Sequence, residues 1–299
     1  MKKFICLFMT VVAFTLGSCS KDDDSTDSTG SDDDIDIVDD TDDDDDDDTD
    51  DDELTGENET FEIQSVLNSD VSGTVTFKKH ASGATTIEIN LDGTSSGSYP
   101  VHLHNGSTAE DGAIAIILNN VDGDSGVSIT KVSGLDDGTP IDYSALIAYD
   151  GYISVYTTAD FDNYLAKGDI GINQLTGESV AYNLNSITED GIEGTATIHQ
   201  RISGAALVEI KLEGTTSGNS YPAHIHFGAA EEGGNIVVTL EAVKGGLGTS
   251  TTQVEMLEDE TPVTYDDLIV YDGHINVHLS AEEIGTIVTQ GNIGANAVN

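Results

Sequence analysis

The chain has 299 residues, of which 56 are acidic and 10 are basic, so its formal net charge at pH 7 is −46. Such an excess of negative charge repels nucleic acid and anionic lipid headgroups, and nucleic acid is therefore excluded as a partner. The two cysteines, Cys6 and Cys19, both lie near the N-terminus, so neither a disulfide framework nor thiol chemistry is expected in the rest of the chain.

Residues 1–18 have the organisation of a lipoprotein signal peptide. Lys2 and Lys3 begin it, a short apolar run follows, and small residues precede Cys19. The run is shorter than the roughly 20 residues of a spanning helix. The pattern resembles a bacterial lipobox with Cys19 as the lipidated residue, the alternative being an ordinary signal peptide with a spare cysteine. The following Ser-Lys-Asp-Asp-Asp resembles the export signal of Bacteroidetes surface lipoproteins, which implies an outer-membrane anchor and exposure at the cell surface.

Residues 19–57 are dominated by aspartate, with Asp42 to Asp48 unbroken. A run of like charges cannot bury enough apolar surface to offset the entropy lost on ordering, so it predicts a disordered, extended tether. Its carboxylates would gather divalent cations as counterions, because no defined cage of ligands is recognisable.

Two similar units follow, at 58–178 and 179–299. The stretch IEINLDGTSSGSYPVHLHNG (87–106) matches VEIKLEGTTSGNSYPAHIHFG (208–228), and the other matches keep nearly the same separation. A repeat of about 120 residues has the size of a single domain, which favours two tandem domains over a solenoid.

Each unit has the pattern of a β-domain. Apolar and polar residues alternate in 87–91 and 208–212, as in half-buried strands. The continuous apolar runs 114–118 and 236–240 indicate more central strands. Turn-forming residues separate these segments, so the spacing favours an antiparallel sandwich or barrel.

Two shorter patterns predict local structure. A Thr-Pro followed by Tyr-x-x-Leu-Ile predicts one helical turn at Tyr143–Ile147 and another at Tyr265–Ile269. The Asp122–Ser125 segment has the start of a calcium loop but no glutamate at the twelfth position and no counterpart in the second unit. It therefore predicts a turn.

Four motifs of the second unit have counterparts, in the same order, in the first: the His-x-His after Tyr-Pro, a Pro-Val-x-Tyr-x-x-Leu stretch, YDGHINVH (271–278) and the closing QGNIGAN (290–296). Together they resemble the CHRD domain, named after chordin, over 59–173 and 180–299. The resemblance implies two tandem immunoglobulin-like or superoxide-dismutase-like antiparallel β-sandwiches. It implies no enzymatic activity, and no catalytic residues are predicted.

The histidines of the second unit fall on one side of two predicted strands. In Ala223–Phe227 the apolar residues share one face while His224 and His226 share the other. In the later strand, His274 and His278 alternate with apolar residues in the same way. The apolar faces must form the core, so the histidines are expected on the outer face, under loops. If these strands are neighbours, the four imidazoles converge and could bind copper or zinc.

The first unit differs at two of these four positions. It carries His102, His104, Tyr152 and Tyr156, and cannot build the same site. Because His-x-His persists there, a structural role is the preferred interpretation, with the imidazoles hydrogen-bonded to loop backbone or to Asp150 and Asp272.

The His-x-His strand resembles the copper-ligand strand of copper/zinc superoxide dismutase. However, no histidine lies between His226 and His274, so the bridging and zinc ligands of that enzyme have no counterpart. Its catalytic arginine has none either, because Arg201, the only arginine, precedes the motif. His80 and His199 are predicted to be exposed strand residues. Tryptophan is absent, which weakens a carbohydrate-binding interpretation, although Tyr152 and Tyr156 could form a modest aromatic surface.

The preferred hypothesis is a lipid-anchored surface protein that binds or scaffolds an unknown extracellular protein or polysaccharide without catalysis. Tandem modules suit such a role through avidity. No cofactor is expected on this view. The alternative is a copper- or zinc-binding, or redox, function of the second unit.

Overall fold

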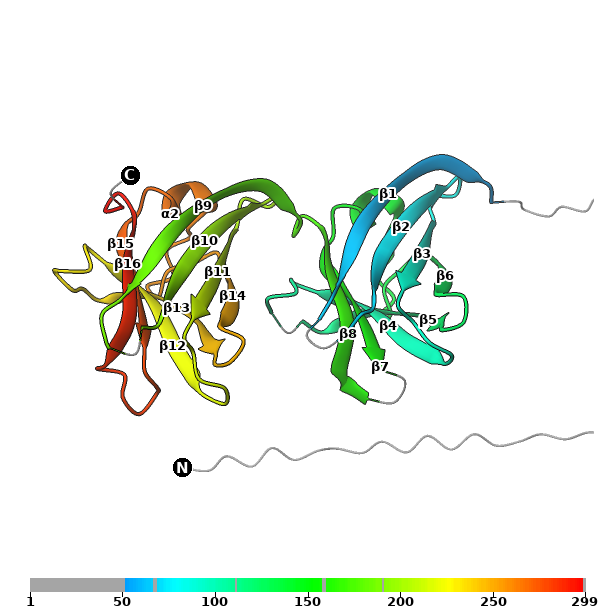
Figure 1. Cartoon of the computed structure of the whole chain (residues 1–299). Helices are drawn as coiled ribbons and strands as arrows, with labels where there is room; N and C mark the ends of the chain where they lie inside the picture. The colour runs from blue at the N-terminus through cyan, green and yellow to red at the C-terminus, as the bar shows by residue number, and fades with distance from the viewer. Residues whose placement is uncertain (1–51, 67–68, 111, 158–159, 190, 298–299) are drawn as a thin grey trace, which may run out of the picture. The chain divides into compact units, whose positions relative to one another are not determined.

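The computed structural model describes residues 52–66, 69–110, 112–157, 160–189 and 191–297. The predicted signal peptide, Cys19 and most of the predicted tether lie outside these ranges. The described residues form two closed antiparallel β-barrels of eight strands each (Figure 1). None of the helices in the described ranges has the length and apolar character needed to cross a membrane.

The first barrel has the strand order β1-β2-β3-β6-β5-β4-β7-β8. Its elements are β1 (Leu54–Ser65), β2 (Ser72–His80), β3 (Thr85–Asp92), β4 (Ser98–Asn105), β5 (Ile114–Asp122), β6 (Val127–Val132), α1 (Tyr143–Leu146), β7 (Asp150–Thr157) and β8 (Asp160–Gly171).

The second barrel repeats this order as β9-β10-β11-β14-β13-β12-β15-β16. Its elements are β9 (Leu175–Ser186), β10 (Glu193–Arg201), β11 (Ala206–Glu213), β12 (Ser220–Phe227), β13 (Ile236–Lys244), β14 (Thr249–Val254), α2 (Tyr265–Leu268), β15 (Asp272–His278) and β16 (Ile287–Gly294).

The predicted sandwich is wrong, although the all-β class is confirmed. In the first barrel β8 pairs back onto β1, with Lys167 opposite Gln64. In the second barrel β16 pairs with β9, with Thr289 opposite Ser186. Because the last strand of each unit pairs with its first, each sheet closes on itself and a sandwich of two separate sheets does not form.

Glycines lie where each barrel closes. A Cβ at Gly168 of β8 would be 2.2 Å from the carbonyl oxygen of Glu62, and a Cβ at Gly291 of β16 would be 2.0 Å from that of Asn183. Any side chain here would collide with backbone of the first strand. These glycines begin the Gly-x-Ile-Gly motif, so the motif permits the close approach of the closing strands.

Gly291→Ala is expected to lower the free energy of unfolding by roughly 2 kcal/mol, because the new methyl forces the closing strands apart. The matched control is Gly285→Ala, since a Cβ at Gly285 meets no heavy atom within 4 Å. Urea denaturation followed by circular dichroism measures both. Equal midpoints for the two variants would show that the seam tolerates a side chain.

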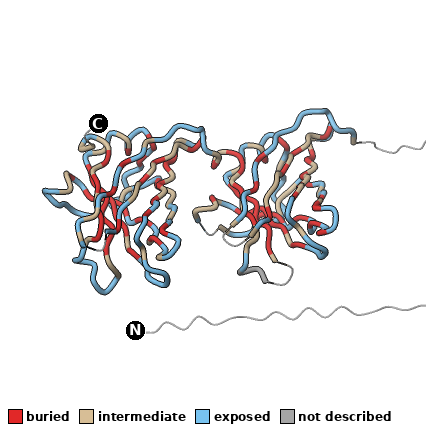
Figure 2. The backbone as a smooth tube through the Cα atoms, in the orientation of Figure 1, coloured by how far each residue is buried: buried red, intermediate tan, exposed pale blue. Residues whose placement is uncertain are grey.

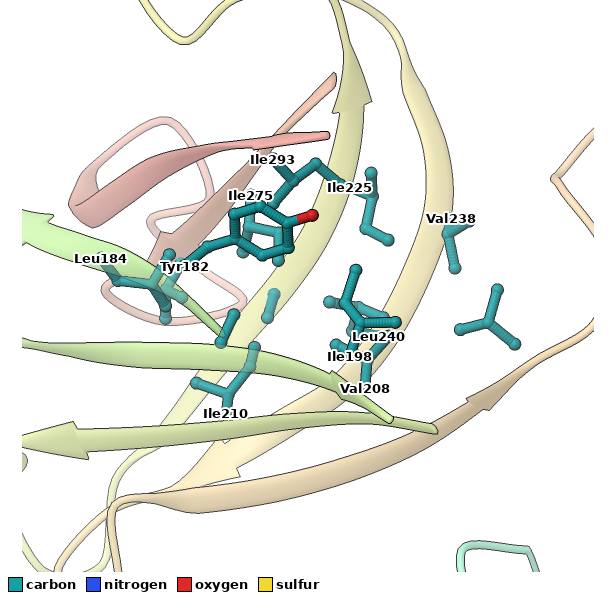
Figure 3. Close-up of a cluster of buried hydrophobic side chains, with 14 of the residues drawn as sticks. Tyr182, Leu184, Ile198, Val208, Ile210, Ile225, Val238, Leu240, Ile275 and Ile293 are labelled. Atoms are coloured by element: carbon teal, nitrogen blue, oxygen red, sulfur yellow. The ribbon is translucent and has the colours of Figure 1, made fainter. Parts of the chain in front are cut away.

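Each barrel has its own apolar core. In the second barrel, alternate residues of neighbouring strands meet inside, including Ile198, Val208, Ile225 and Ile275 (Figure 3). Buried positions concentrate in the same way within the first barrel (Figure 2). The predicted assignment of the alternating apolar faces to the core is confirmed.

The predicted local elements are also confirmed. Helical turns occupy Tyr143–Leu146 and Tyr265–Leu268. In the second, the Thr264 side chain accepts from the backbone of Asp267 and the Asp267 carboxylate accepts in return, forming a capping box. Asp122 accepts from the Ser125 backbone N–H at 2.9 Å, as in a turn.

Candidate metal centre in the second barrel

Strands β12 and β15 carry the four histidines and are direct neighbours. The antiparallel register places His226 opposite His274 and His224 opposite Asn276. Ile225 and Ile275 face the core, so the histidines point to the outer face of the barrel wall. The condition under which the four imidazoles converge, that these two strands adjoin, is therefore met.

The outer face is covered, so the rings are buried. Exposed fractions are 8% for His224, 9% for His226, 0% for His274 and 6% for His278. The loop after β12 contacts them directly: the carbonyl of Gly234 lies 2.9 Å from His226 Nδ1, and that of Gly228 lies 2.7 Å from His274 Nδ1. A carbonyl only accepts, so Nδ1 carries the proton in both rings and Nε2 is left as a donor to metal.

Glycines let this loop pass so close to the rings. A Cβ at Gly234 would be 1.8 Å from the carbonyl oxygen of Phe227, and the equivalent Gly112 is similarly crowded by Asn105. The predicted hydrogen bonds from the imidazoles to loop backbone are confirmed for His226 and His274, although the glycines that supply the carbonyls were not singled out. The glycine repeated at the same distance after each His-x-His was the available signal.

Three of the four histidines form a group suited to one ion. One nitrogen from each of His224, His226 and His278 lies within 4.8 Å of the others. Zinc–nitrogen bonds are about 2.0–2.1 Å, so small side-chain rotations would bring the three nitrogens onto one ion. Three imidazoles leave a further coordination position for water or another ligand.

These rings have unsatisfied nitrogens. Nδ1 of His224, Nε2 of His226 and both nitrogens of His278 are buried without a hydrogen-bond partner among the described residues. A buried polar atom left in this way costs roughly 1–3 kcal/mol. The residues present therefore fit an ion that would satisfy these atoms together.

Burial also favours the neutral form of two of these rings. It lowers the pKa of His224 and of His278. The His226 imidazole lowers the pKa of His224 further, and the His224 and His226 imidazoles lower that of His278. The backbone of Ile284 acts in the opposite direction on His278, without forming a hydrogen bond of normal geometry. Neutral imidazole is the form that binds a metal.

The metal-free protein is expected to lose stability as the pH falls from about 7 to 5. Burial lowers the folded-state pKa of His224, His274 and His278, so the unfolded chain binds more protons below its histidine pKa of about 6.5. This stability is fully present above that pH and is lost as the pH falls through the folded-state pKa values.

Urea midpoints measured with chelator at about pH 7, 6 and 5 test this expectation, since carboxylates lose their contribution only below about pH 4. A His224→Gln/His278→Gln double variant should show a smaller decrease. An unchanged midpoint of the unmodified protein over this range would contradict the assignment of neutral buried rings.

His274 lies outside the group of three. Its ring stacks on His226 with centroids 5.1 Å apart and an interplanar angle of 18°. In the first barrel Tyr152 stacks on His104 in the same way, at 4.8 Å and 16°. In both barrels, therefore, the ring at this position (His274 or Tyr152) stacks on the second histidine of His-x-His.

In the first barrel, a tyrosine hydroxyl is the partner of the second histidine of His-x-His. His104 Nε2 lies 2.7 Å from the hydroxyl of Tyr156, and His104 Nδ1 lies 2.8 Å from the Gly112 carbonyl. Tyr156 occupies the position equivalent to His278, and His102 lies beside it with ring centroids 5.0 Å apart. The hydroxyl provides a partner that His226 lacks in the second barrel.

Other expectations need correction. His80 is buried rather than exposed: its Nδ1 lies 2.6 Å from the Asp52 carbonyl and its Nε2 lies 2.7 Å from Thr86 Oγ1. Arg201, at the equivalent position, donates to the Asn173 carbonyl. The last residue of β2 thus bonds the segment before β1, and the last residue of β10 bonds the segment before β9. His199 is half-buried and lies 3.5 Å from Glu209.

The aromatic and acidic residues singled out in the sequence have different neighbours from those expected. Tyr152 and Tyr156 are 1% and 2% exposed, so they form no carbohydrate-binding surface. Asp150 and Asp272 accept from Asn173 and Asn296, respectively, at 2.7 and 2.6 Å.

Comparison with known proteins adds no assignment to this geometry. No protein-family model matches the chain. No curated protein matches it either.

Proposed function

We propose that the second barrel binds one transition-metal ion through His224, His226 and His278. The observation that carries this proposal is the convergence of buried ring nitrogens that lack hydrogen-bond partners. Elsewhere in protein interiors such atoms are nearly always paired. An ion would pair all three rings in one step.

The donor set favours copper(II) over zinc(II). Imidazole nitrogen suits both ions, and copper binds more tightly at a given nitrogen site. All three ligands are neutral, so the bound ion would retain its charge, which the strongly acidic chain favours.

Metal titration of the purified whole chain tests the proposal. After chelator treatment and dialysis, about one equivalent of copper(II) or zinc(II) should bind tightly, and binding at 100 times the dissociation constant should stabilise the second barrel by about 2.7 kcal/mol. His224→Gln should abolish the tight equivalent. His199→Gln, a histidine outside the group, should retain it.

Two results would reject the site. One is an intact chain that keeps less than about a tenth of an equivalent after gel filtration, where a tight site should keep nearly all of its ion. The other is tight binding that survives in the His224→Gln variant, which would place the ion on other carboxylates or histidines.

The first barrel favours a second role. It repeats the whole fold, but the Tyr156 hydroxyl already occupies His104 Nε2. Metal binding does not explain its retention. We infer a shared, non-catalytic role in binding an extracellular protein or polysaccharide, in a CHRD-type surface lipoprotein anchored through Cys19. The support is the signal and tether composition and the duplicated motifs.

Retention of the chain by cells or extracellular polymer should require both barrels for full avidity, and failure of retention would count against this role.

A further inference from the structure

Tyr156 of the first barrel forms a directed hydrogen bond with His104. The Tyr156 side chain is 2% exposed, and its oxygen lies 2.7 Å from His104 Nε2. The other ring nitrogen of His104 lies 2.8 Å from the Gly112 carbonyl, which can only accept. His104 therefore carries its proton on Nδ1, and the Tyr156 hydroxyl donates to the lone pair on Nε2.

An aromatic contact leads from Tyr156 towards the surface. The ring of Tyr164, which is only half-buried, lies 5.0 Å from that of Tyr156. The Lys167 ammonium lies 3.5 Å from the centre of the Tyr164 ring. The buried phenol is thus in contact with an outer aromatic ring through which an electron can leave.

We propose that Tyr156 and His104 form a one-electron donor site in which the loss of an electron is coupled to transfer of a proton. Tyr156 gives one electron to an oxidised transition-metal complex at the surface, and its hydroxyl proton moves to His104 Nε2. The products are a neutral tyrosyl radical, an imidazolium whose Nδ1–H still donates to Gly112, and the oxidant reduced by one electron. Return of the electron from the reduced complex, with transfer of the proton back from His104, restores the pair.

The surroundings favour transfer of the proton from Tyr156 to His104. Burial raises the pKa of Tyr156 to about 12, so the phenol is protonated at neutral pH. Oxidation without loss of the proton would leave a phenol radical cation, which is a much stronger acid than imidazolium, so the positive charge moves to His104, whose Nδ1–H already donates to the Gly112 carbonyl. A neutral base within hydrogen-bond distance removes that charge from the phenol as the electron leaves. Burial then shields the neutral radical from solvent.

The second barrel has no equivalent pair. His278 replaces Tyr156 and His274 replaces Tyr152, so this proposal is independent of the metal centre. It concerns a different barrel and survives even if no metal binds.

Flash-quench oxidation of the whole chain with photogenerated ruthenium(III) tris(bipyridine), in the presence of chelator, tests the proposal. Electron paramagnetic resonance should detect a neutral tyrosyl radical whose yield falls at least about tenfold in Tyr156→Phe, because the coupled base accelerates proton loss by that much or more. Tyr143→Phe removes another buried hydroxyl of the same barrel and should retain the signal.

Two further measurements keep the test decisive if a variant folds poorly. His104→Gln leaves Tyr156 in place but removes the proton acceptor, so radical formation should slow by a similar factor. In the unmodified chain the step should be slower in deuterium oxide than in water. Equal rates in both solvents, or an unchanged radical yield in Tyr156→Phe, would overturn the proposal.

Discussion

His278→Tyr is expected to abolish metal binding and to stabilise the metal-free second barrel. The first barrel shows the arrangement that results: Tyr156 stands at this position and its hydroxyl bonds the second histidine of His-x-His at 2.7 Å. In the variant, the new hydroxyl should donate to His226 Nε2, which now lacks a partner. The substitution also removes the two unsatisfied nitrogens of His278.

The expected gain in the free energy of unfolding is roughly 1–2 kcal/mol, since satisfying a buried polar atom recovers about that much and the larger ring offsets part of it. Hydrogen exchange of the β12 and β15 amides in the presence of chelator measures the second barrel without interference from the first. The same variant should bind none of the tight metal equivalent.

His278→Phe is the matched control, because it also removes the imidazole but supplies no hydroxyl. The difference in exchange protection between the two variants reports the new hydrogen bond alone. If the tyrosine variant is no better protected than the phenylalanine variant, the two barrels do not share the same network geometry.

The sequence predicted the repeated domains and the direction of the side chains, but it did not predict closure of the sheets. Alternation with a period of two is the same for a strand in a sandwich and in a barrel. The distinction depends on a few pairings between the first and last strands, such as Gln64 with Lys167. The glycines at those seams, Gly168 and Gly291, were recognised as a motif without their close approach to the opposing strand.

The candidate site, too, was predicted only in part from the sequence. The alternation placed His224, His226, His274 and His278 on one outer face, and the register of β12 and β15 brings them together. It could not separate His274, which stacks on His226 and bonds Gly228, from His278, which joins the group of three. That difference depends on a loop carbonyl and on ring orientation, neither of which has a signature in the pattern of apolar and polar residues.

The reverse substitution, Tyr156→His, is expected to give the first barrel a metal site. It would place a third imidazole beside His102 and His104, the positions equivalent to His224 and His226. The new ring would remove the hydroxyl that now satisfies His104 Nε2. The variant chain should therefore bind about two tight equivalents of copper(II) where the unmodified chain binds one, with a metal-free first barrel roughly 1–3 kcal/mol less stable.

Tyr152→His is the control for this gain, since it copies His274, the stacking position, rather than a member of the group of three. It adds an imidazole to the same face but should leave the stoichiometry at one. Inductively coupled plasma mass spectrometry after gel filtration gives the metal content of each variant. A second equivalent in the Tyr152 variant, or none in the Tyr156 variant, would mean that the residue at position 156 or 278 does not decide which barrel holds the ion.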